Sequence, residues 1–250
     1  RSPAKATKKT TFGGTYLKPL MYHIHNQLLL FGALLIAICG QSFAQDATPT
    51  PWNEANEHWE NATELWQHEK YSNALFSYEE WIAEQTDLAS TQCALACYRV
   101  AFCSIQLQQA DAANRVKDFL SDYPENPLGQ KIQWELANYF YRKRDWNDAI
   151  DAFNGLNPLR MKPAEKLEKK FKRGHSHFEL EQFEEARLDL FTVMEGGEDA
   201  GQYQMPARYY FSHISYLKGQ PQVALEGFQS LESEPRFQHL VPIYIAQLLH

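Results

Sequence analysis

The chain has 250 residues, and hydrophobic residues make up 44% of it, which is enough to bury a core and excludes wholesale disorder. Its net charge is −7, but residues 1–44 hold five basic residues and no acidic one, so 19 basic and 31 acidic residues remain beyond position 44, a balance of −12. A surface this negative repels phosphate groups, so we expect no nucleic-acid partner and no attraction to anionic lipid.

The first predicted element is an export signal. Residues 28–39 form an unbroken apolar stretch, which is too short to span a bilayer, since that needs about 20 residues. The stretch fits the apolar region of a secretory signal peptide, and small residues at positions 42 and 44 match the pattern read by a signal peptidase. We therefore predict a signal peptide over residues 21–44, cleavage between Ala44 and Gln45, and a periplasmic or other cell-envelope location. After cleavage, the chain is expected not to span a membrane.

The start of this signal leaves two alternatives open. Counted from Met21, the leading region has no Lys or Arg, whereas Lys18 lies just upstream. Either translation begins before Met21, or the signal relies on its amino terminus and two histidines, in which case residues 1–20 are an untranslated extension. A buried core helix is the other interpretation of the apolar stretch, but residues 45–54 after it are typical of a linker. Cys39 follows Ile38 rather than the small residue of a lipoprotein signal, which argues against a lipid anchor.

A repeat occupies the rest of the chain. Five segments share an Ala, followed four residues later by a bulky residue, and successive alanines lie 38, 37, 37 and 38 residues apart. We predict that each unit is a pair of amphipathic helices whose second helix begins near the Ala, which lets the two helices approach closely. The alanines are Ala74, Ala112, Ala149, Ala186 and Ala224, and the bulky residues are Tyr78, Val116, Phe153, Leu190 and Phe228.

The pattern resembles the tetratricopeptide repeat family, which has a small residue in the first helix, an aromatic before the turn, then the Ala, a further aromatic and a closing Pro. The third and fourth repeats match best, with Ala137, Trp146, Ala149, Phe153 and Pro158 in the third and Gly174, Phe183, Ala186 and Leu190 in the fourth. The family repeat has about 34 residues, and the longer spacing here is similar to that of large exported repeat proteins of Bacteroidota. The resemblance implies an all-α solenoid, a right-handed superhelix of helix pairs, over residues 55–250. Its predicted repeats are 55–88, 93–126, 130–163, 167–200 and 205–238, and residues 241–250 are expected to be the first helix of a sixth repeat, cut before its partner.

The resemblance also implies where a partner binds, because the first helices of this family line the concave wall. With the repeated Ala taken as position 20, positions 5 and 12 face the groove together. The second repeat places Cys97 and Ser104 there. The other four repeats place aromatic side chains at both positions: Trp59, Trp66, Trp134, Tyr141, Phe171, Phe178, Tyr209 and Tyr216.

Polar candidates lie beside these rings, namely Asn138, Arg142, His175 and His213. The functional interpretation is an aromatic groove that holds a peptide segment. The alternative is that the rings pack between neighbouring first helices and meet no ligand.

Other chemistry is weakly indicated. His175 and His177 are two residues apart on a predicted helix and point in different directions, so we predict no metal site. Cys93, Cys97 and Cys103 share one predicted helix, where small buried residues are the expected role. We find no phosphate-binding loop and no nucleophile motif, and we therefore predict no cofactor and no catalytic residue.

The function expected from these features is that of a non-catalytic protein–protein interaction scaffold or adaptor of the bacterial cell envelope. Two alternatives stay open. One is a docking arm for a larger enzyme or signalling protein whose active domain lies beyond residue 250. The other is a structural spacer in outer-membrane assembly or secretion.

Overall fold

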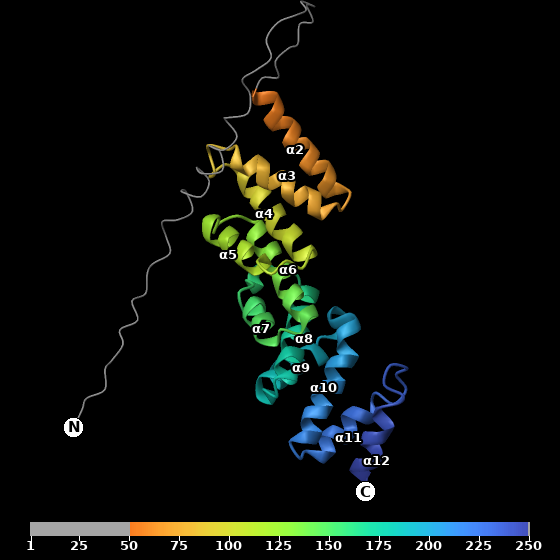
Figure 1. The fold of residues 1–250 in the computed structure, drawn as a ribbon. Helices are drawn as coiled ribbons and strands as arrows, with labels where there is room; N and C mark the ends of the chain where they lie inside the picture. The colour runs from red at the N-terminus through yellow and green to blue at the C-terminus, as the bar shows by residue number, and fades with distance from the viewer. Residues whose placement is uncertain (1–50, 250) are drawn as a thin grey trace, which may run out of the picture. The chain divides into compact units, whose positions relative to one another are not determined.

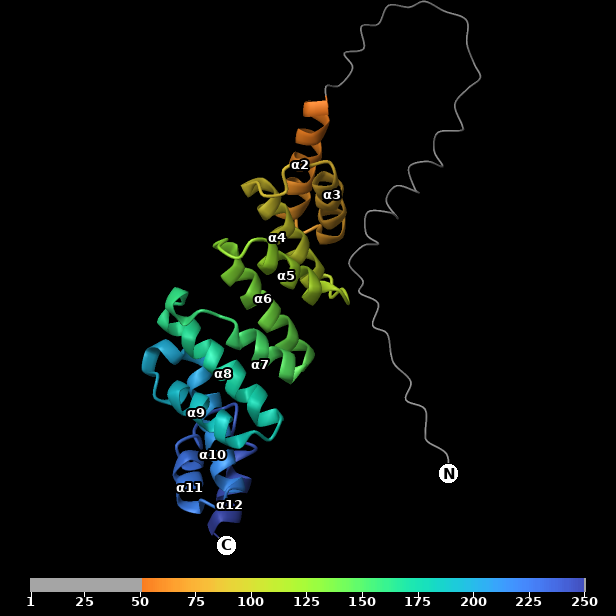
Figure 2. The ribbon, with the colours of Figure 1, turned by 90° about the vertical axis from the view of Figure 1, so that its left-hand side faces the viewer.

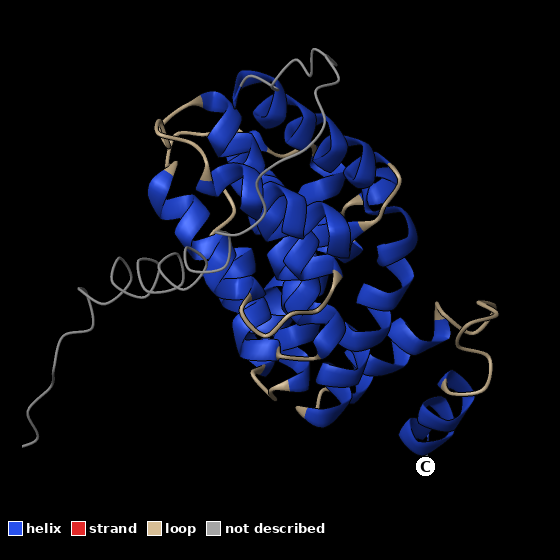
Figure 3. Ribbon diagram, turned by 45° about the horizontal axis from the view of Figure 1, so that its top comes forward, coloured by secondary structure: helices blue, strands red, loops and turns tan. Residues whose placement is uncertain are grey.

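A computed structural model describes residues 51–249, and every regular element in that range is a helix (Figures 1 and 3). The predicted signal peptide and residues 45–50 of the predicted linker lie outside the described residues, whereas residues 51–54, also expected to be linker, begin the first described helix. None of the helices within residues 51–249 is long and apolar enough to cross a bilayer.

The helices form five consecutive pairs followed by one more helix, and neighbouring pairs pack against each other in chain order (Figure 2). This is the predicted all-α solenoid of five repeats and a further first helix. The pairs are α2 (Pro51–Gln67) with α3 (Tyr71–Ala83), α4 (Thr91–Gln106) with α5 (Ala112–Asp122), α6 (Leu128–Lys143) with α7 (Trp146–Asn154), α8 (Pro163–Glu179) with α9 (Phe183–Met194), and α10 (Gln204–Leu217) with α11 (Pro221–Gln229). Helix α12 (Val241–Leu249) follows, and two short 3₁₀ helices, η1 (Pro158–Arg160) and η2 (Gly197–Tyr203), lie in the links around α8 and α9.

The repeated Ala is the point where the two helices of each pair meet. All five repeated alanines are fully buried, and so are the five bulky residues that follow them. A methyl group at this position lets the second helix approach the first closely, and the bulky side chain one turn later fills the space below. The repeat seen in the sequence is therefore the packing repeat of the solenoid.

A single residue with a positive φ angle turns the chain between the helices of each pair. Four of these residues are not glycine, and their φ angles are 56°, 54°, 62° and 57°, whereas Gly219 has a φ angle of 65°. The left-handed conformation costs a residue with a Cβ atom about 1 kcal/mol or more, so packing of the helices must maintain it. The non-glycine turn residues are Glu69, Gln108, Arg144 and Glu181.

The turn of the second repeat is one residue shorter than the others. The buried Ala112 lies four residues after the turn residue Gln108, whereas the repeated Ala lies five residues after the turn residue in the other four repeats. In α4, the first helix of this repeat, counting back from the turn residue therefore gives a register that differs by one residue from counting back from the Ala. The structure supports this register, because the position seven residues before the turn is then small and buried in every repeat: Ala62, Ala101, Ala137, Gly174 and Ser212.

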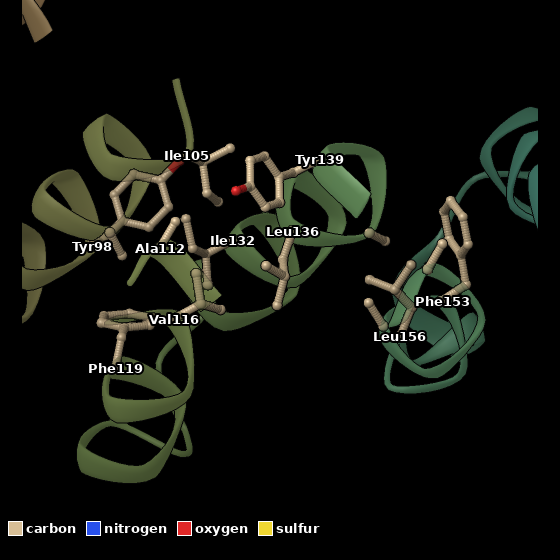
Figure 4. Close-up of a cluster of buried hydrophobic side chains, with 14 of the residues drawn as sticks. Tyr98, Ile105, Ala112, Val116, Phe119, Ile132, Leu136, Tyr139, Phe153 and Leu156 are labelled. Atoms are coloured by element: carbon tan, nitrogen blue, oxygen red, sulfur yellow. The ribbon is translucent and has the colours of Figure 1, made fainter. Parts of the chain in front are cut away.

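One hydrophobic cluster joins the second and third repeats (Figure 4). Tyr98 of α4 and Phe119 of α5 meet Ile132 of α6, and the cluster continues to Phe153 of α7. Burial between repeats as well as within each pair explains why the pairs stack, since a single pair cannot cover its own apolar surface.

Candidate functional site

The predicted binding residues lie on α2, α4, α6, α8 and α10, whose shared surface we call the first-helix face. The predicted aromatic residues on it are buried or half-buried, and Phe171 has only 8% of its surface exposed. Their rings contact each other and the second helices in three groups along the chain.

The first group surrounds a cation. The guanidinium carbon of Arg99 on α4 lies 5.4 Å from the ring centre of Trp59, 5.6 Å from that of Trp66 and 5.3 Å from that of Tyr78. Arg99 also donates hydrogen bonds to Thr63, at 3.0 Å, and to the Tyr78 hydroxyl. Three aromatic faces around one guanidinium give favourable cation–π contacts, which hold α4 against α2 and α3.

In the second repeat, the register of α4 differs from the predicted one. Ser104 is buried and its hydroxyl donates to the Ala101 carbonyl oxygen, while the Cys97 sulfur lies 3.8 Å from the Tyr123 hydroxyl. Counted from the turn residue, the positions equivalent to Trp59 and Trp66 are Tyr98 and Ile105, both of which are buried. Numbering from the Ala missed them because the shorter turn moves α4 by one residue.

The second group centres on His175 of α8. Its Nδ1 atom lies 2.9 Å from the Tyr141 hydroxyl and its Nε2 atom lies 3.3 Å from a Glu179 carboxylate oxygen. The ring stacks on Phe171 and lies 4.7 Å, centre to centre, from Tyr210 of α10. Burial lowers the pKa of His175 below its usual value, although Glu179 opposes that shift. A neutral imidazole therefore contacts side chains of both α6 and α10 from its place on α8. Burial raises the pKa of the Tyr141 hydroxyl as well.

The third group surrounds His213 of α10. Its ring centre lies 5.5 Å from that of Phe178, 5.9 Å from that of Tyr209 and 5.1 Å from that of Tyr244 on α12. Tyr216 lies against the same Tyr244 ring at 5.5 Å. Burial lowers the pKa of His213, so this ring is also held neutral.

The polar candidates behave differently from each other. Asn138 is buried and accepts a hydrogen bond of 2.6 Å from the Lys172 ammonium. The same ammonium lies 5.6 Å from the ring centre of Trp134 and 2.5 Å from a Glu168 carboxylate oxygen. Arg142 is exposed on α6. Asn138 is therefore engaged in packing, whereas Arg142 is accessible.

Three further residues of this face, Arg99, Lys172 and Tyr210, were not predicted from the sequence. All three lie nine residues before a turn residue, at a position that holds Glu60 and Glu135 in the other two repeats. Lys172 and Tyr210 occupy this position whether the residues are counted from the Ala or from the turn, whereas Arg99 occupies it only when they are counted from the turn.

The three cysteines among residues 51–249 all lie on α4. Cys93, Cys97 and Cys103 are unpaired, and burial raises the pKa of Cys103 to about 12, which keeps this thiol protonated. Within residues 51–249 no group of three His, Cys, Asp or Glu side chains is arranged to hold a metal ion.

Trp134 has open space beside it. A hollow of about 750 Å³ lies between α6, α8 and the η1 link, and Trp134 forms part of its wall. Most of the other predicted rings pack against each other, and Arg142 is the exposed polar candidate.

Comparison with known proteins identifies the fold. No family model and no curated protein matches the sequence. A tetratricopeptide repeat protein from Parabacteroides merdae is 16% identical, with a TM-score of 0.56, over 78% of this chain and 72% of that one. MamA from Desulfovibrio magneticus RS-1 is 14% identical, with a TM-score of 0.53, over 74% of this chain and 97% of that one.

A third solved structure, of TPR-like repeats from a putative kinesin light chain of Podospora anserina, is 13% identical, with a TM-score of 0.51. It covers 74% of this chain and 97% of that one. At these identities the likeness concerns the fold alone. The chain has a TPR-like α-solenoid fold, as the sequence repeat predicted.

Proposed function

We propose that this TPR-like chain is a non-catalytic scaffold that holds a segment of a partner protein against its first-helix face. The observation that carries the proposal is the composition of that face. Aromatic rings occupy nine of the ten positions that lie ten and three residues before the turn residues. Aromatic and Arg side chains are enriched at protein interfaces, and solenoids use their extended surfaces for binding.

We also propose that the protein acts in the cell envelope after export. The support is the apolar stretch of residues 28–39 and the small residues before Gln45. Amino-terminal sequencing of the protein from its own cells, combined with cell fractionation, tests this part. A mature chain that begins at Gln45 in the envelope fraction supports export, and an intact signal in the cytoplasmic fraction contradicts it.

Site-specific photo-crosslinking tests the binding proposal without disturbing the packing. A photoreactive amino acid is placed at Glu60 or Arg142, which are exposed on first helices, and, as matched controls, at Lys117 or Glu185, which are exposed on second helices. We expect discrete adducts with a partner from the first two positions and not from the controls. Adducts only from the second helices, or from none of the four positions, would refute the proposal.

A further inference from the structure

The hollow beside Trp134 has features of a binding subsite. Its volume of about 750 Å³ lies in the range of ligand pockets. Trp134, Met161 and Pro127 contribute apolar surface, and Glu125 and Glu165 are among the charged residues that line it. An apolar wall with charged groups around it suits a large side chain whose neighbours are charged.

The loop that closes one side of the hollow is held rigidly. Asn157 donates from its backbone nitrogen to the side-chain oxygen of Gln130 at 3.0 Å, and its carbonyl oxygen accepts from the Gln130 amide at 3.2 Å. The Asn157 side chain caps η1 by accepting from the Leu159 nitrogen at 2.9 Å. A loop that is already held in place lowers the entropy cost of binding, because the partner does not have to order it.

Two carboxylates of the hollow are available to a cationic partner. Glu168 lines the hollow but is already paired with the Lys172 ammonium, which leaves Glu125 and Glu165, beside Lys131 and Arg160. The Lys131 ammonium lies 5.9 Å from the ring centre of Tyr98 on α4, which is on the side of α6 that contacts the preceding repeat.

The Glu165 carboxylate is itself held in position. It accepts a 2.9 Å hydrogen bond from the backbone nitrogen of Lys162, the residue before α8, and so caps the start of that helix. The net charge of −12 beyond residue 44 adds a long-range attraction for basic segments.

We propose that this hollow is the anchor subsite for the partner segment, and that it takes a large apolar side chain adjacent to Lys or Arg. The apolar side chain lies against Trp134 and Met161. The neighbouring cation lies near Glu125 and Glu165. This inference rests on the proposed function, because it names the chemistry of the segment that the scaffold holds.

Binding of synthetic peptides to the purified full chain, in the form its host produces, tests the inference. The probe is Gly-Ser-Leu-Lys-Phe-Lys-Leu-Ser-Gly, blocked at both ends so that it carries no terminal charge, and labelled for fluorescence anisotropy. One comparison peptide has Glu in place of both Lys, and another has Ser in place of Leu and Phe. We expect the first peptide to bind at least about tenfold more tightly than either comparison peptide.

Variants of the hollow then locate the binding. Trp134→Ala is expected to weaken binding of the basic peptide by about tenfold or more. The double variant Glu125→Gln with Glu165→Gln keeps the α8 cap, since Gln can replace Glu there, and is expected to weaken binding several-fold and to reduce its salt dependence. The double variant Asp118→Asn with Glu185→Gln removes the same charge from exposed second-helix positions and is the matched control.

Each outcome decides the inference. It is overturned if the acidic or the Ser peptide binds as tightly as the basic one, if no peptide binds, or if the Glu125 and Glu165 double variant matches its control. Circular dichroism of each variant separates loss of binding from loss of folding. Partner adducts at Glu60 or Arg142 that persist in such a case would leave the scaffold function intact and refute the subsite alone.

Discussion

Replacing Arg173 with Met should reveal how much one ion pair contributes to the centre of the solenoid. Arg173 of α8 donates from Nε and from its second terminal nitrogen to the two carboxylate oxygens of Asp189 on α9, at 2.6 and 2.8 Å. A third bond of 2.7 Å reaches Asn154 at the end of α7. The side chain of Asp189 is only 7% exposed, and that of Arg173 is 26% exposed.

The magnitude follows from this burial. Removing one partner of a fully buried ion pair costs about 3–5 kcal/mol, because the remaining charge stays desolvated. The guanidinium here is partly exposed to water, so we expect Arg173→Met to lower the free energy of unfolding by about 2–3 kcal/mol. The double variant Arg173→Met with Asp189→Leu removes both charges and should be more stable than Arg173→Met alone.

Urea unfolding followed by circular dichroism measures these differences, and hydrogen exchange of α8 and α9 shows whether the loss is local, since a solenoid can open in parts. A loss below about 0.5 kcal/mol would mean that the pair behaves as an exposed ion pair, and our reasoning from burial would be wrong.

Three further predictions concern the same helices. Gly174→Ala should destabilise the chain by about 1–2 kcal/mol in urea unfolding, because the added methyl would lie 3.0 Å from the Asp189 Cβ atom; a gain of about 1 kcal/mol, the helix propensity of Ala, would contradict this. Glu181→Gly should raise stability by up to about 1 kcal/mol in thermal unfolding, because its φ angle of 57° is strained for a residue with a Cβ atom; an unchanged or lower melting temperature would show that the turn carries no strain. Burial lowers the pKa of His175 from 6.5, so its contribution to stability is fully present above pH 6.5 and is lost as the pH falls from there through the lowered pKa of the folded chain. His175→Gln should therefore make the free energy of unfolding less dependent on pH in that range, while the contribution of His213 remains. An unchanged pH dependence in the variant would contradict this role of His175.

The fold could be predicted because its signal is local and repeated. An Ala that must be buried where two helices meet, followed by a bulky residue one turn later, leaves a pattern that does not depend on distant contacts. The aromatic residues of the first helices were found by the same counting. Their role could not be decided in that way, because a ring such as Phe171 is covered by neighbouring first helices, and a helical pattern alone does not show which neighbours approach.

The second repeat shows how a local feature escapes the pattern. Its turn at Gln108 is one residue shorter, and Gln, Glu and Arg at the turn positions carry no marker of a left-handed conformation. Among the five turn residues, only Gly219 is of a type that readily adopts a positive φ angle. Numbering from Ala112 therefore placed Cys97 and Ser104 where the helix presents Tyr98 and Ile105.

The apolar spacing within each repeat is sufficient to specify the helix pairs and their order. Which groups are accessible depends instead on how the repeats pack against each other. One wall of the hollow beside Trp134 is held in place by hydrogen bonds between Gln130 of α6 and the loop at Asn157. Arg173 pairs with Asp189 because α8 and α9 pack closely at Gly174. Both depend on residues from different helices, whose distances are set by the packing of whole repeats and are not encoded in any single segment.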